Sequence, residues 1–270
     1  MNAPYLHYLF LKKVTLKLDP MILNELEYDD NLIFNLSNFK NIGNFYSLKS
    51  FKDKYNFTSN FNDKFNEFIV ECLLNIEKHN DYNQLYFIYA LVSSYTLEKY
   101  INEYIESLNN DKLNDDEIYK MIDFSIASEN NIDISKNNLY KIFKNSFNYY
   151  DYMDNLIHNP CIRLFKFLAS TNYFKKCYKN KKKYYKKFMN YNLRYPIHKF
   201  ISLISKSKKR VKDMIYKDNR LNDLKLIDDN TLDLALNDVL NQIKAINEYL
   251  FDDKESDLRK IYNIEKDKKI

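Results

Sequence analysis

The sequence predicts an all-α protein built as a single compact multi-helix domain. Its 270 residues include one glycine and four prolines, whereas sheets joined by tight hairpins normally need turn glycines. Apolar residues recur at helical spacing, and asparagine and aspartate, which favour turns, separate the segments that carry them. No linker rich in glycine, serine or proline divides the chain, and no repeat of about 30 to 45 residues is visible. Two domains and a helical solenoid are therefore both disfavoured.

Helices are expected wherever apolar periodicity continues between turn residues. The last one is the clearest, because "DDNTLDLALNDVLNQIKAINEYL" begins with an Asx N-cap and carries apolar residues along one face. The domain is expected to cover 1–251, and the mostly charged residues 252–270 are expected to fray. In chain order, we expect helices at about 4–18, 20–27, 60–79, 82–106, 114–129, 136–148, 151–170, 172–190, 197–216 and 229–251.

One of these helices carries an unusual stripe of polar residues. At about 100° per residue, the stretch "YFIYALVSSYTLEKYINEYI" places its apolar side chains in one sector, together with Ser94, Glu98 and Asn102. A buried polar group without a partner costs about 1–3 kcal/mol. The stripe therefore predicts either a hydrogen-bonded polar layer between helices or a binding site. The apolar members of the sector are Phe87, Ala90, Leu91, Leu97, Ile101 and Ile105.

Charge is distributed unevenly along the chain. Residues 155–212 contain no Asp or Glu and 17 Lys and Arg, so the remainder of the chain carries −12 of the total formal charge of +5. The densest part is "YFKKCYKNKKKYYKK", residues 173–187, which has eight lysines and five aromatic residues. Lysines interleaved with aromatic residues are typical of segments that bind an anionic membrane surface or single-stranded nucleic acid. The alternative interpretation is a helix face that is exposed to solvent and binds neither.

We expect this basic segment to bind an anionic phospholipid surface. Arginine, the usual reader of bases, is scarce in it, which favours lipid over nucleic acid. The lysines expected to make the contact are Lys175, Lys176, Lys179, Lys181, Lys182, Lys183, Lys186 and Lys187.

Cysteine usage and hydropathy bear on where the protein resides. Cys72, Cys161 and Cys177 are odd in number and form no C-x-x-C pair, which argues against a disulfide framework. No run of about 18 uncharged apolar residues exists, and the start of the chain lacks a secretory leader pattern. A cytoplasmic protein without a transmembrane segment, peripheral to the membrane, is expected.

Three stretches of the chain resemble a known family. They are "PYLHYLFLKKVTLKL", "NLIFNLSNFKNIGNFYS" and "ALVSSYTLEKYINEYI". They are similar to the opening pattern of the bacterial zinc-dependent phospholipase C-like proteins, to their F-N-L-G-S-Q-G-P-D-I-F-F-Y-S segment and to their G-F-x-x-H-Y-x-L-D-x-x-x-H-P-Y-I segment. "NYNLRYPIHKFISLISKSKKRV" also resembles the family's Asn-rich stretch before its final helices. The resemblance implies an all-α phospholipase C fold.

The same resemblance implies an eroded metal site. His7 stands at a metal-ligand histidine, whereas Ser94, Glu98 and Asn102 stand where the family has His, Asp and His. The family's H-x-x-x-E-x-x-x-D element falls on Asp115, Tyr119 and Asp123, and "KNI" replaces its Gly-Pro-Asp. Catalytic zinc needs imidazole and carboxylate ligands and an open position for water. Most of those ligands are replaced, so the resemblance implies no cofactor, with a residual zinc ion as the alternative.

Three functional hypotheses follow. The first is a non-catalytic phospholipase C-like protein that binds anionic phospholipid. The second is an active metal-dependent phosphodiesterase that uses an altered site of His7, Glu98, Asp115 and Asp123. The third is a basic all-α protein that binds nucleic acid or a partner protein.

Overall fold

The computed structural model describes four continuous stretches of the chain and several short helical pieces. The residues described are 3–20, 33, 36–37, 62–107, 118–119, 122–123, 125–126, 160, 163–164, 179–180, 227–252 and 255–263. Within them nearly all residues are helical and no strand occurs, which confirms the all-α prediction for this part of the chain.

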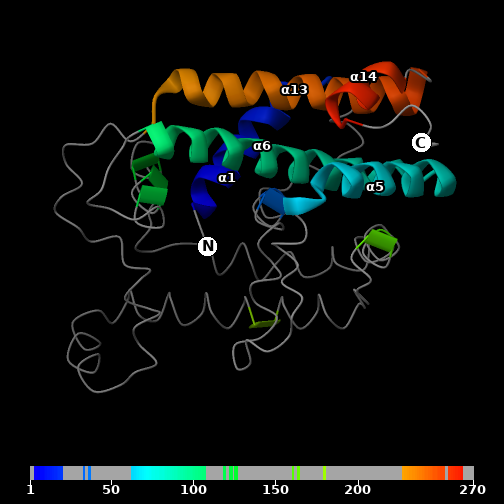
Figure 1. The fold of residues 1–270 in the computed structure, drawn as a ribbon, viewed down its shortest axis with the longest axis horizontal. Helices are drawn as coiled ribbons and strands as arrows, with labels where there is room; N and C mark the ends of the chain where they lie inside the picture. Colours follow the sequence, from blue (N-terminus) through cyan, green and yellow to red (C-terminus); the bar gives the residue numbers. More distant parts are fainter. Residues whose placement is uncertain are drawn as a thin grey trace.

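Five α-helices and one 3-10 turn make up the continuous stretches (Figure 1). They are α1 (Pro4–Thr15), α5 (Phe65–His79), the 3-10 turn η2 (Tyr82–Gln84), α6 (Leu85–Ser107), α13 (Asp229–Asp252) and α14 (Glu255–Ile261). The expected helices at 4–18, 60–79, 82–106 and 229–251 are present with slightly shifted ends. The one expected at 82–106 begins as η2 before it continues as α6.

α6 is the central helix of the described structure. α13 lies along it, and α1 packs against both (Figure 1). Every residue from Leu85 to Ser94 is buried, because this half of α6 is surrounded on all sides. A helix that is buried all round can be apolar all round, and "LYFIYALV" fits that description. The six apolar residues predicted to face the core are all buried.

The helix ends follow from local chemistry. α5 stops at Asn80, whose φ of 52° is left-handed, a conformation that asparagine tolerates better than most residues. α13 starts after Asp228, whose carboxylate accepts a hydrogen bond from the Thr231 amide at 2.7 Å. The Asx N-cap predicted for this helix is thereby confirmed.

The C-terminal part of the chain departs from the prediction. Residues 252–270 were expected to fray, but α14 forms within them, with Leu258 fully buried and Tyr262 3% exposed. The Tyr262 carbonyl accepts a hydrogen bond from Asn66 of α5 at 3.3 Å, and its hydroxyl donates to Gln242 of α13 at 3.4 Å. Within the segment expected to fray, 255–261 are therefore helical and packed against the rest of the described structure. The many charged residues of this segment made it look unable to pack, but the two apolar residues Leu258 and Tyr262, four positions apart, are buried.

The other expected helices are described in part or not at all. Those at 136–148 and 197–216 lie outside the described residues. Those at 20–27, 114–129, 151–170 and 172–190 are described only at isolated positions, all of them helical. In the described residues, no helix combines the length and apolarity needed to cross a bilayer.

Candidate functional site

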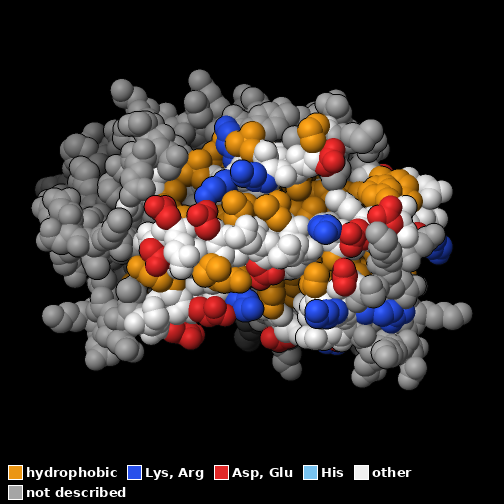
Figure 2. All heavy atoms as spheres, turned by 90° about the horizontal axis from the view of Figure 1, so that it is seen from above, with side chains coloured by type: hydrophobic (Ala, Val, Ile, Leu, Met, Phe, Trp, Pro, Cys, Tyr) orange, Lys and Arg blue, Asp and Glu red, His pale blue; other side chains and the backbone are white. Residues whose placement is uncertain are grey.

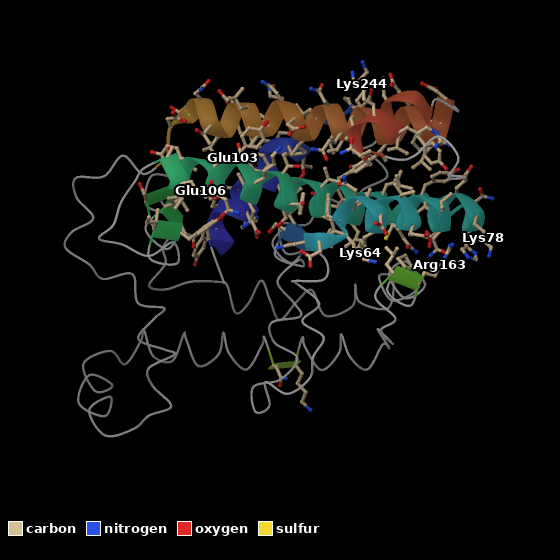
Figure 3. The ribbon with its side chains drawn as sticks, viewed as in Figure 1. Lys64, Lys78, Glu103, Glu106, Arg163 and Lys244 are labelled. Carbon is tan, nitrogen blue, oxygen red and sulfur yellow. The ribbon has the colours of Figure 1, made fainter. Side chains whose placement is uncertain are left out.

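The polar stripe of α6 runs from the interior to the surface. Ser94 is 3% exposed, the Glu98 side chain is 17% exposed, and Asn102 is exposed. Four-residue spacing places the three on one side of the helix. Only the first two therefore face the interior as predicted, since Asn102 is exposed although Ile101 and Ile105 of the same part of α6 are buried. Figure 3 shows Glu103 and Glu106 at this same end.

His7 of α1 lies opposite Ser94 and Glu98. Its Nδ1 is 3.1 Å from Ser94 Oγ, and its Nε2 is 3.5 Å from Glu98 Oε1. The two α6 side chains are one helical turn apart, and an imidazole presents nitrogens on two sides, so one ring spans both. A neutral His7 that accepts from the Ser94 hydroxyl presents its Nε2–H to the carboxylate. The buried imidazole thereby links α1 to α6.

Asp123 binds the start of α1. Its side chain is fully buried, and Oδ1 accepts hydrogen bonds from the backbone amides of Tyr5 and Leu6, each at 2.8 Å. The first amides of a helix have no acceptor within the helix. Ala3 occupies the N-cap position and has no side chain that could accept them. Asp123 supplies that acceptor from a distant segment, and its negative charge also suits the positive end of the α1 dipole.

Asn102 is joined to Tyr119. The Tyr119 hydroxyl donates to Asn102 Oδ1, and the Tyr119 side chain is otherwise buried. These two residues stand where the resembled family has a histidine and a glutamate. In this chain they form a neutral hydrogen-bonded pair.

Five of the six predicted metal-site positions are thus described, and four of them make contacts that involve α1. These four are His7, Ser94, Glu98 and Asp123. Asn102 lies further along α6 with Tyr119, and Asp115 lies outside the described residues.

The described side chains do not fit a multinuclear zinc site. The Asp123 oxygen is directed at two backbone amides, His7 Nδ1 at a serine hydroxyl, and the Asn102 oxygen at a phenol. Serine hydroxyls and asparagine carbonyls are not the usual zinc ligands. Among the described residues, no three His, Cys, Asp or Glu side chains are placed to hold one metal ion.

A second polar network joins α6 to α13, and the sequence analysis missed it. Gln242 donates to Thr96 Oγ1 at 2.9 Å and to Asp238 at 3.1 Å, and Tyr100 donates to Asp238 at 3.3 Å. Gln242 lies three residues after Val239 and four before Ile246, so it shares their buried face of α13. This spacing could have predicted from the sequence that Gln242 is buried. The network satisfies polar groups in the main interface of the described structure.

Two tyrosines whose hydroxyls bond to α13 are strongly affected by burial. Burial raises the pKa of Tyr89 above its ordinary value of 10.0, although its hydrogen bond to Asn247 opposes the shift. Burial, followed by the negative charge of Asp238, also raises the pKa of Tyr262. Both hydroxyls remain neutral donors in the folded protein well above neutral pH.

The predicted anionic-surface residues lie mostly outside the described part of the chain. Of the eight lysines, Lys179 is described, and it is an exposed helical residue. Earlier in the acid-free segment, Arg163 forms a 2.7 Å ion pair with Glu71 of α5. The face seen in Figure 2 mixes Lys and Arg with Asp, Glu and hydrophobic side chains. The acid-free segment 155–212 is the part of the sequence where positive charge is concentrated.

Comparison with known proteins adds no family assignment: no protein-family model, curated protein or solved structure matches the chain.

Proposed function

We propose that this chain is a divergent phospholipase C-like protein in which hydrogen bonds replace the zinc cluster, and that it binds anionic phospholipid surfaces without hydrolysing them. Its hydrogen-bonded polar groups join α1 to α6, Asp123 to α1 and Tyr119 to α6. The basic segment 173–187 makes the contact with lipid.

The observation that carries the proposal is that His7 meets Ser94 and Glu98, while Asp123 binds the start of the helix that carries His7. The family resemblance singles out these positions from three separate parts of the sequence. His7 lies 87 residues from Ser94 along the chain, yet their side chains are 3.1 Å apart. Asp123 lies 118 residues from Tyr5, yet accepts its amide hydrogen at 2.8 Å. Such convergence is expected if the chain descends from a protein whose metal ligands met at this place.

The absence of hydrolysis follows from the chemistry of the replacements. A catalytic zinc ion lowers the pKa of its bound water to about 7 and must keep a coordination position open for it. Here Ser94 and Asn102 are neutral, and their oxygens are hydrogen-bonded to His7 and Tyr119. Asp123 accepts two backbone amides instead of facing a cation.

Lipid binding rests on the number and spacing of the lysines. Each lysine near an anionic membrane contributes about 1 kcal/mol, and the effect fades within a Debye length of about 10 Å. Four or five simultaneous contacts therefore give useful affinity, and the eight lysines of 173–187 exceed that number. The five aromatic residues interleaved with them add insertion at the interface, which salt does not screen.

A vesicle co-sedimentation experiment tests the proposal. The purified chain is mixed with phosphatidylcholine vesicles, with vesicles that also contain phosphatidylserine, and with single-stranded oligonucleotides. We expect binding to the phosphatidylserine vesicles that weakens with salt yet keeps a salt-resistant part. Preference for the oligonucleotide, with a steep linear dependence of log affinity on log salt, would instead indicate a nucleic-acid-binding protein.

Two variants of equal charge show whether location matters. The test variant replaces Lys181, Lys182, Lys183, Lys186 and Lys187 by Gln. The matched control replaces five exposed lysines elsewhere, namely Lys17, Lys78, Lys99, Lys244 and Lys260. Both reduce the formal charge from +5 to zero. Loss of binding in the first variant alone supports the proposal, whereas unchanged binding in the first would identify the segment as a solvated face.

A further inference from the structure

We draw no further inference here: the strongest candidate, the exposed apolar surface at Leu16, which follows α1, and at Leu234 of α13, has nothing in the described part of the structure that shows what covers it.

Discussion

Asp123 is the residue whose loss should affect the fold most directly, because it accepts two buried backbone amides at once. Asp123→Ala leaves the amides of Tyr5 and Leu6 without this acceptor. At about 1–3 kcal/mol for each unsatisfied buried group, we expect the free energy of unfolding to fall by about 3 kcal/mol. Urea denaturation followed by circular dichroism measures the change.

Two further variants give this experiment its controls. Asp123→Asn retains one carbonyl oxygen, so it should lose less stability than Asp123→Ala. Asp257→Ala removes an exposed carboxylate from α14 and should change stability by less than about 0.5 kcal/mol. If Asp123→Ala unfolds at the same urea concentration as the Asp257 variant, the role assigned to Asp123 is wrong.

Tyr89 and Tyr262 should make stability depend on pH in the alkaline range. Their pKa values are raised in the folded state, chiefly by burial. Their contribution to stability is therefore complete below the unfolded-state pKa of about 10 and is lost as pH rises above it. Between about pH 8 and pH 11, each tyrosine should remove roughly 1 kcal/mol from the free energy of unfolding.

Phenylalanine variants isolate this effect from other alkaline titrations. Tyr89→Phe and Tyr262→Phe should each show a smaller loss of stability over the same pH interval than the parent chain. An identical pH dependence in parent and variants would contradict the assignment. The measurement is urea unfolding at the two pH values.

At the scale of secondary-structure elements, the docking of α14 is the feature that most changes the expected architecture. Leu258 is fully buried, so Leu258→Ala should destabilise the fold by about 2–5 kcal/mol. Leu234, on α13, is 49% exposed, and Leu234→Ala should cost less than about 0.5 kcal/mol. Thermal or urea unfolding compares the two variants. Equal small effects would mean that the C-terminal part is frayed, as its charge pattern alone suggests.

At the scale of the whole molecule, the proposed replacement of the zinc cluster predicts a fold that does not depend on metal. The protein purified without chelators should contain less than one zinc ion per chain and should not hydrolyse phosphatidylcholine. Its unfolding temperature should be the same before and after treatment with a chelator, because contacts within the protein already hold His7 against Ser94 and Glu98, and Asp123 against two backbone amides. Elemental analysis, a phospholipase assay and calorimetry test these three outcomes.

Two or more zinc ions per chain, or phosphodiesterase activity that a chelator abolishes, would establish the altered metal site of His7, Glu98, Asp115 and Asp123 as the working one. A double variant, Ser94→His with Asn102→His, restores two imidazoles at the family's positions. It should bind zinc more tightly than the parent chain, and isothermal titration calorimetry with zinc alone measures the difference.

Features that depend on neighbours along the chain could be predicted from the amino-acid sequence alone. Apolar spacing predicts the helices at 82–106 and 229–251, and the buried face of α6 contains all six predicted apolar residues. The cap at Asp228 follows from its position immediately before a periodic segment. These features are local, because side chains three or four residues apart share a helix face wherever the helix packs.

Which groups meet across that face could be seen only once the helices were packed together. Spacing shows that Ser94, Glu98 and Asn102 lie on one side of α6, but not that His7 lies opposite the first two while the third is exposed. It also does not show that α14 docks through Leu258 and Tyr262. The physical reason is that periodicity specifies the direction of a side chain about its own helix axis. The partner in that direction comes from another segment, and packing among helices distant in sequence selects it.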